Sequence, residues 1–482
     1  MLSMTYDISA TILRGIEMEH TPTIRSTIET ELKQRGYTFS SFSKVSGINR
    51  GTFSTMLNSN PPKPISVRQM DLITKALGYP EGWLYDLYID ECFHEGKGHW
   101  KRIKPFLLRC VELGRKDCIR RVLWRLTEDL SYVRTIFEFA EELHEAGKER
   151  ESVPFYECVI ENERYHHSER LAISQYRLFC YSLNTDLDNN RQAAIKFAPF
   201  RRNLPENYQL DALLKLANTY FQLYDCETVI QYAEELRVLA TSIYQQQVRG
   251  KLKNREVKPL NTERRLIVYY GQSFLLKGNA YEIQGQYKKA MEFIPYYADL
   301  TDFEGLDDIG KIEAQKFKVW AKANQLSMEI LMGNMESLPA YVELLRDNSQ
   351  EILHGLLTIV ESANIYNYPI DDILILFAEK IDEFRELNVN ISYYHTNYNL
   401  VTYSRFFLEL SRYYFNTGAY SKAMDGMLKS FKASSQLNDK AYYIKSITLL
   451  FEKYKDHSTY EQQEEYGKLL EEVQYNAKHM LP

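Results

Sequence analysis

The chain has 482 residues, which is too long for one ordinary hydrophobic core, so two or more domains are expected. A hydrophobic content of 44% and a charged content of 26% describe a soluble globular protein, and the net charge of −6 excludes a chain that is basic throughout. Only 21 Gly and 14 Pro are present, which fits long helices with few turns better than a sheet protein.

The chain carries no sign of membrane insertion or secretion. No apolar run reaches the ~18 residues that a membrane-spanning helix needs, and residues 1–20 lack the basic start and apolar stretch of a signal peptide. The six cysteines are dispersed without a CxxC pair and lie mostly in apolar helical patterns, which predicts free buried thiols. We therefore expect a cytoplasmic protein that does not bind a membrane.

The first expected helix covers residues 22–35. Ile24, Ile28 and Leu32 recur at every fourth position and form one apolar face, and Gly36 follows as the stop. Further along, the three prolines in residues 59–66 predict a loop. Ser66 can then cap another helix, which ends at Gly78.

Residues 38–57 predict two short helices joined by a tight turn. Ser43 is the small residue where the helices cross, Gly47 lies where the chain reverses, and the second helix opens at Asn49. The apolar side chains that can fill the small core between the helices are Phe42, Ile48 and Phe53. The polar start of the second helix, Asn-Arg-Gly-Thr, is short enough to reach base edges in a major groove.

Charge is distributed unevenly along the chain. Residues 21–84 contain eight Lys and Arg against four Asp and Glu, a net charge of +4, so the remaining residues carry −10. A basic head on an acidic body is the pattern expected when only the head contacts phosphates.

Residues 23–84 resemble the lambda-repressor-like (Cro/C1, or XRE) DNA-binding domain. The matching features are the turn glycine, the polar cap, an apolar residue four positions later, a proline loop, a helix ending in Ala-Leu-Gly and an apolar closing pair: Gly47, Asn49, Phe53, Pro61–Pro64, Ala76–Gly78 and Trp83-Leu84. One departure is Phe39, because the family usually has Gln there, near a phosphate.

The resemblance implies which residues contact DNA. The residues implied to face the groove are Asn49, Arg50, Gly51, Thr52 and Thr55, and those expected on phosphate are Lys44 and Arg68. Arg50 is the groove residue that can bind guanine with two hydrogen bonds. The alternatives are a phosphate contact or a solvated side chain for Arg50, and a helix N-cap without base contact for Asn49.

From residue 104 to residue 472 the pattern is one helix after another, with internal repeats. The segments GNAYEIQGQYKKAMEFIPYYADL (278–300) and SRYYFNTGAYSKAMDGMLKSFKA (411–433) align on Gly285 and Gly418. They resemble the tetratricopeptide repeat, an antiparallel helix pair of ~34 residues. The resemblance implies five to eight repeats stacked as an α-solenoid, with a concave face suited to an extended peptide or a partner's helix.

Asparagines are the candidate peptide-binding residues of that face, because one amide both donates to and accepts from a peptide backbone. Asn218 and Asn279 stand in the same register, two residues before a tyrosine. Further candidates are Asn324, Asn397 and Asn399. The alternative for each is a solvated side chain or a bond within its own repeat. The basic run at 245–265 is either a solvated loop or a second contact with DNA or an acidic partner.

No catalytic or metal-binding constellation is recognisable. Walker, GxSxG, HExxH and dinucleotide motifs are absent. Cys92, His94 and His99, like the pair at 166–167, lack the paired spacing of a zinc site. We expect neither an enzyme nor a bound metal or cofactor.

We therefore expect an all-α chain with an N-terminal extension (1–20), a helix-turn-helix DNA-binding domain (21–88), a linker (89–104) and a tetratricopeptide-like repeat domain (105–482). This architecture resembles the peptide-sensing regulators of Gram-positive bacteria and their phages, which include Rgg, PlcR, NprR and the arbitrium receptors. It implies a homodimer whose binding to a double-stranded operator is controlled by a short oligopeptide. Two alternatives remain: repeats that sequester a protein such as a response regulator, and a DNA-bound scaffold without a small ligand.

Overall fold

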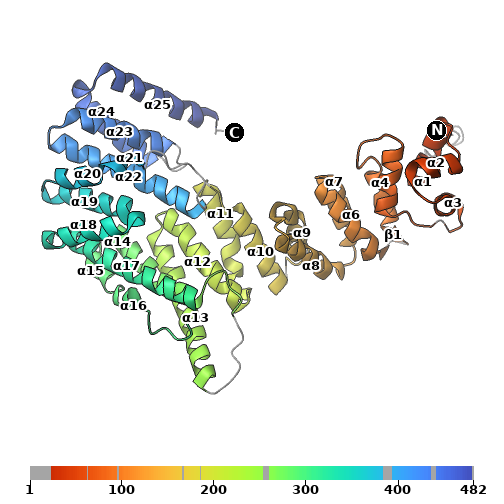
Figure 1. The fold of residues 1–482 in the computed structure, drawn as a ribbon, viewed down its shortest axis with the longest axis horizontal. Coiled ribbons are helices and arrows are strands. Elements are labelled where there is room, and N and C mark those ends of the chain that lie inside the picture. Colours follow the sequence, from red (N-terminus) through yellow and green to blue (C-terminus); the bar gives the residue numbers. More distant parts are fainter. Residues whose placement is uncertain are drawn as a thin grey trace, which may run out of the picture. The chain divides into compact units, whose positions relative to one another are not determined.

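The computed structural model describes residues 23–61, 63–94, 97–164, 168–184, 186–252, 260–383, 393–435 and 441–479. These residues are almost entirely helical, which confirms the expected all-α class (Figure 1). None of the helices in this part of the chain combines the length and apolar character needed to cross a bilayer. The chain divides into two compact units, unit 1 at residues 1–164 and unit 2 at residues 165–482.

Unit 1 contains nine helices and one small hairpin among its described residues. They are α1 (Ile24–Gln34), α2 (Phe39–Ser46), α3 (Arg50–Asn58), α4 (Val67–Ala76), α5 (Tyr85–Glu91), β1 (Phe93–His94), β2 (Lys97–Gly98), α6 (Trp100–Glu112), α7 (Lys116–Leu126), α8 (Tyr132–Glu145) and α9 (Glu149–Asn162). The helix starts are set by side-chain caps. Thr23, Thr38 and Ser66 each form a reciprocal capping box with the residue three positions on, so the predicted cap at Ser66 is confirmed.

Residues 89–104, where we expected a linker, are structured. They form the end of α5, the antiparallel hairpin β1–β2 and the start of α6. Ile89, Cys92, Phe93 and Ile103 are buried. Ile89, Cys92 and Phe93 have a helical spacing, but the polar Gly-Lys-Gly-His run separates them from Ile103, so no single period continues through the segment and the sequence pattern indicated a linker.

Arginines of α6 and α7 bind acidic residues of α4 and α5. The Arg109 Nε–Asp71 Oδ2 distance is 3.1 Å, and Arg115 reaches Asp86 at 2.8 Å. Arg125 makes a further contact of 2.7 Å with an α5 carboxylate. These pairs and the buried residues of the hairpin join the first five helices to α6–α9, so the first compact unit extends to residue 164 rather than ending near residue 88.

Unit 2 is built from helices that return beside one another. The described elements are α10 (Glu169–Ser182), α11 (Leu187–Phe197), η1 (Ala198–Asn203), α12 (Glu206–Gln222), α13 (Cys226–Leu252), α14 (Leu266–Ile283), α15 (Tyr287–Met291), α16 (Pro295–Ala298), α17 (Asp308–Leu331), η2 (Met335–Ser337), α18 (Leu338–Asp347), η3 (Ser349–Glu351), α19 (Ile352–Tyr366), α20 (Asp371–Leu376), α21 (Ala378–Glu383), α22 (Tyr393–Asn416), α23 (Tyr420–Ser435), α24 (Ala441–Tyr454), η5 (Lys455–His457) and α25 (Tyr460–His479). The helices α12, α14, α17, α19 and α22 form a row in which each packs against the next (Figure 1).

Each helix of this row ends at a residue with a left-handed backbone. The five residues, with φ between 55° and 92°, are Tyr224, Gly285, Gly333, Asn367 and Gly418. A left-handed residue satisfies the last carbonyl groups of a helix and reverses the chain. The reversal lets the following segment return along the row, as α13 returns beside α12 and α23 beside α22.

The cysteines and the core agree with the sequence expectations. All six cysteines are free thiols, five of them buried. Apolar clusters run from helix to helix in unit 2, and one of them joins residues of α17, α18, α19 and α22. Burial of such clusters contributes roughly 25 cal/mol per Å² of apolar surface, the largest favourable term in folding.

The close approach of α14 to α17 at Gly271 generates a stability prediction. A methyl group on Gly271 would overlap the buried ring of Phe317. Although Ala favours a helix over Gly, we expect Gly271→Ala to lower the free energy of unfolding by about 1–3 kcal/mol through overpacking.

The matched control is Gly467→Ala in α25, where an added methyl group meets no atom within 4 Å. This substitution should raise the free energy of unfolding by up to about 1 kcal/mol. Urea denaturation of both variants measures the two effects. Equal stability of Gly271→Ala and the unsubstituted chain would show that α14 and α17 do not approach each other as described.

Candidate functional site

The turn between α2 and α3 holds the predicted DNA-contacting residues. Gly47 has φ of 71°, and the Ser43 hydroxyl donates to the Ile48 carbonyl at 2.6 Å. The Asn49 side chain accepts from the Gly51 N–H at 2.8 Å and caps α3. The capping role given as the alternative for Asn49 is therefore present in the structure, and the base contact of Asn49 stays a prediction.

Aromatic packing holds α3 against α2. Phe42 and Phe53 are fully buried with ring centroids 5.2 Å apart. Phe39 packs edge-on against Phe53 at 5.4 Å. Phe39 thus serves the core between the two helices, which explains why an aromatic residue replaces the polar residue usual at this position in the resembled family.

The first turn of α3 is exposed and cationic. Arg50 and Gly51 are exposed at its start, Thr52 is half-buried, and Thr55 is exposed with its hydroxyl donating to the Thr52 carbonyl at 2.9 Å. Arg50 forms no ion pair with any residue that the structure describes. An arginine without an internal partner at the start of a helix is available to an external anion.

The phosphate candidates differ from the other basic residues of the head. Lys44 and Arg68 are exposed and, within the described part of the chain, unpaired. Arg25, in contrast, binds Glu91 and donates to the Met56 carbonyl at 2.9 Å. Arg35 is likewise engaged, with Glu31 at 3.1 Å. Arg25 and Arg35 are therefore engaged within unit 1, whereas Lys44 and Arg68 are open to an external anion.

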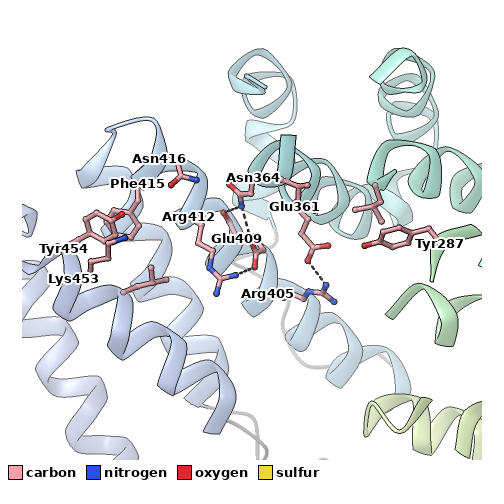
Figure 2. Close-up of a pocket in the computed structure, with 13 residues that line it drawn as sticks. Tyr287, Glu361, Asn364, Arg405, Glu409, Arg412, Phe415, Asn416, Lys453 and Tyr454 are labelled. Carbon is pink, nitrogen blue, oxygen red and sulfur yellow. Dashed lines mark hydrogen bonds and ion pairs between the residues drawn. The ribbon is translucent and has the colours of Figure 1, made fainter. Parts of the chain in front are cut away.

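A second candidate site is a cavity of about 510 Å³ in unit 2 (Figure 2). Its walls come from α15, α17, α19, α22 and α24. The lining residues are Tyr287, Leu331, Glu361, Asn364, Ile365, Arg405, Glu409, Arg412, Phe415, Asn416, Leu450, Lys453 and Tyr454. A volume of ~300–1,000 Å³ is usual for pockets that bind small ligands.

Two ion pairs cross this cavity. Arg405 of α22 binds Glu361 of α19 at 2.7 Å, and Arg412 binds Glu409 within α22 (Figure 2). The Asn364 amide nitrogen donates to the Glu409 backbone carbonyl at 2.9 Å and to its carboxylate at 3.1 Å. The Asn364 carbonyl oxygen is buried and has no donor among the described residues. Asn364 lines the cavity, and a ligand N–H that reached this oxygen would satisfy it.

A third carboxylate lies beside the first ion pair. Burial raises the pKa of Glu282, at the end of α14, to about 7, and the negative charge of Glu361 adds to this, while Arg405 opposes it. The Ser327 hydroxyl lies 3.5 Å from the carboxylate. Burial also lowers the pKa of His354 on α19 to about 4, with Arg405 adding to the effect, so His354 is neutral at pH 7.

The predicted peptide-binding asparagines have separate environments. Asn218 on α12 and Asn279 on α14 are half-buried and make no hydrogen bond with the described residues. Asn324 on α17 donates to the Tyr297 hydroxyl on α16 at 3.0 Å, so its amide is engaged by a neighbouring helix. The side chains of Asn397 and Asn399 lie outside the described residues.

The left-handed residues define one sequence position in the row helices that the sequence only partly indicated. Six positions before each of them stands one residue of the helix row: Asn218, Asn279, Ser327, Glu361 and Arg412. Asn218 and Asn279 were expected in this register, whereas Asn324 lies three positions away from it. The alignment of Gly418 with Gly285 places Arg412 at the position of Asn279, but only asparagines were considered as peptide-binding candidates. Glu361 was missed because Asn367, rather than glycine, ends its helix.

One other group has metal-ligating side chains close together, namely Asp86, Asp117 and Cys118 in unit 1. Both carboxylates are held by Arg115, at 2.8 Å in each case. An arginine at the centre supplies the positive charge that a metal would bring, so we assign no metal site here.

The raised pKa of Glu282 makes stability depend on pH. Its folded pKa of about 7 lies above the unfolded value of about 4.3, so the stabilising effect of the bound proton is complete below the unfolded value and is lost as pH rises through about 7. We expect Glu282→Gln, which stays neutral, to match the unsubstituted chain near pH 4.5. At pH 8.5 it should be more stable, by on the order of 1–3 kcal/mol.

Urea denaturation at the two pH values measures this difference. Glu452→Gln is the control, because Glu452 is exposed on α24 and unpaired within the described residues. A Glu282→Gln effect that is the same at both pH values would contradict a proton bound to Glu282 in the folded chain.

Comparisons with other proteins add no assignment to either site. No protein-family model matches the chain, and no curated protein matches it. The functional interpretation therefore depends on the exposed first turn of α3 in unit 1 and on the charged cavity of unit 2.

Proposed function

We propose that this chain is a sequence-specific DNA-binding transcription regulator whose operator binding is controlled by a short signalling peptide held by unit 2. The observation that carries the proposal is the first turn of α3, where Arg50 is exposed and has no ion-pair partner in the described chain. The apolar side of the same helix is fixed by Phe53, Met56 and Leu57, which are buried.

In this proposal α2 and α3 act as a helix-turn-helix of the lambda-repressor-like kind, with α3 in the major groove. A recognition helix presents its N-terminal residues to base edges. Supporting features are the left-handed Gly47 in the turn and the N-cap at Asn49, which together aim the start of α3 outward. Lys44 and Arg68 would contact phosphate, and they are exposed.

The helix row of unit 2 would act as a tetratricopeptide-like solenoid that holds the peptide. Support comes from the repeated left-handed helix ends and from the contact of each row helix with the next. Asn218 and Asn279 have half-buried amides without internal hydrogen bonds, so a peptide backbone could bond to them. The cavity at α19, α22 and α24 would hold a further part of the same ligand.

A homodimer would connect peptide binding by unit 2 with DNA binding by α3. Two half-sites on DNA must be met at a spacing of ~34 Å, so a change in the shape of the repeat region that moves two heads apart weakens binding. The peptide shifts this equilibrium only by its difference in affinity for the two shapes. A tenfold change needs about 1.4 kcal/mol, which one or two additional hydrogen bonds can supply.

The DNA-binding part is tested with a duplex selected from a randomised pool by the full chain. Arg50→Ala should weaken binding to this duplex by about 1–3 kcal/mol, roughly 5- to 150-fold, because a bidentate contact to guanine is lost. The control is Lys33→Ala at the exposed end of α1, which removes the same charge away from the α3 surface. Fluorescence anisotropy measures both. Equal losses of affinity for the two variants would show that Arg50 contributes only non-specific attraction to phosphates, which would contradict a base contact by Arg50.

The peptide part is tested by native mass spectrometry of the chain purified from its own host. We expect a retained oligopeptide at one copy per chain, and we expect Asn279→Ala to lower its occupancy by tenfold or more while the selected duplex still binds. A retained protein partner in place of a peptide would favour the sequestering alternative. A chain that carries neither would contradict control by a peptide.

A further inference from the structure

We propose that the charged cavity of unit 2 receives the C-terminal residue of an oligopeptide, with the free carboxylate bound by Arg412 and Lys453 and the backbone N–H of that residue donated to Asn364. The inference rests on the proposed function and deepens it, because it states which end of the peptide enters the cavity.

The first observation is the charge balance of the cavity walls. Three cationic side chains line the cavity, from Arg405, Arg412 and Lys453, against two carboxylates. Glu361 is bound by Arg405 and Glu409 by Arg412. Lys453 has no carboxylate partner among the described residues, and its ammonium group lies 4.9 Å from the centre of the Tyr454 ring. The unmatched charge is positive, so the cavity favours an anionic group.

The second observation concerns the donors that remain open. Arg412 uses one terminal nitrogen for Glu409, and no other hydrogen bond of its guanidinium to the described residues is present. A guanidinium group has five N–H donors and suits a planar carboxylate. In Figure 2, Arg412 is drawn between Asn364 on one side and Lys453 on the other. Both cations thus border the same space from α22 and α24.

The third observation is the unsatisfied acceptor. The Asn364 amide nitrogen is engaged by both oxygens of Glu409, the backbone and the carboxylate oxygen, which fixes the amide with its carbonyl oxygen free. That oxygen is buried without a donor in the described chain. A ligand that offers this oxygen an N–H or O–H, as well as an anionic group for the cations, would satisfy both features.

The C-terminal residue of a peptide carries both groups, because its backbone N–H and its free carboxylate lie on either side of one α-carbon. Its carboxylate meets the cations and its N–H meets the acceptor, while an isolated anion such as phosphate at neutral pH offers mainly acceptors. Of the remaining lining residues, four are apolar (Leu331, Ile365, Phe415 and Leu450) and three carry polar groups (Tyr287, Asn416 and Tyr454). The four apolar residues favour an apolar side chain on the terminal residue of the peptide.

An ammonium group is the competing occupant, because Glu282 and Glu361 lie near each other beside the cavity. Glu361 is already neutralised by Arg405 at 2.7 Å, however, and Glu282 is not among the lining residues. The cavity itself thus lacks an unmatched negative charge. The N-terminal end of a peptide is therefore the poorer fit, and the experiment separates the two ends.

The test uses the full chain and three pools of random hexapeptides: free at both ends, amidated at the C terminus, and acetylated at the N terminus. Affinity selection followed by mass spectrometry measures the retained amount of each pool. We expect amidation to lower retention by tenfold or more, acetylation to leave it within twofold, and the retained free pool to be enriched in apolar C-terminal residues. Inorganic phosphate at 10 mM, added as a competitor, should not displace the peptides.

A matched pair of variants locates the effect. Lys453→Gln should reduce retention of the free pool towards that of the amidated pool, whereas Lys445→Gln, at an exposed position of the same helix outside the cavity, should not. Circular dichroism checks that both variants fold alike. Equal retention of free and amidated pools, loss on acetylation instead, or displacement by phosphate would each overturn the C-terminal assignment while leaving peptide binding intact. Retention of none of the pools would overturn the proposed function as well.

Discussion

The arrangement of unit 2 depends on how five helices end. Tyr224, Gly285, Gly333, Asn367 and Gly418 adopt a left-handed backbone, which reverses the chain after each helix of the row. The row helices pack each against the next, and the position six residues before each of these ends can be compared along the row. It holds amides in α12 and α14 and charged side chains in α19 and α22. A peptide lying across the row would meet neutral groups at one end and ionic groups at the other.

The head of the chain is constrained in a different way. Arg109, Arg115 and Arg125 fix α4 and α5 to α6 and α7 through partly buried ion pairs, and the β1–β2 hairpin adds apolar contacts. The first five helices therefore belong to one compact unit with α6–α9.

Local signals in the sequence were sufficient for the head, but the repeat region needed the structure. Gly47, Asn49 and Ser66 could be predicted because turns and caps require specific residue types within a few positions. The ion pair of Glu361 joins separate helices and leaves no such local pattern, whereas the pair of Glu409 with Arg412 has the i,i+3 spacing common on helix surfaces, so both glutamates resembled ordinary solubilising carboxylates. Asn324 was placed in the groove by residue type alone, although its amide bonds to Tyr297. Polar residues interrupt the apolar pattern of residues 89–104, so this segment was expected to be a linker although several of its residues are buried.

The central claim is an energetic coupling between the α3 surface and the helix row of unit 2. Coupling is reciprocal: the factor by which a peptide changes the affinity for DNA equals the factor by which DNA changes the affinity for the peptide. The most direct measurement is therefore the dissociation constant of the selected duplex with and without the retained peptide, together with the reverse titration. We predict equal factors of about ten or more, corresponding to at least about 1.4 kcal/mol. A factor of one in both titrations would contradict control of DNA binding by the peptide.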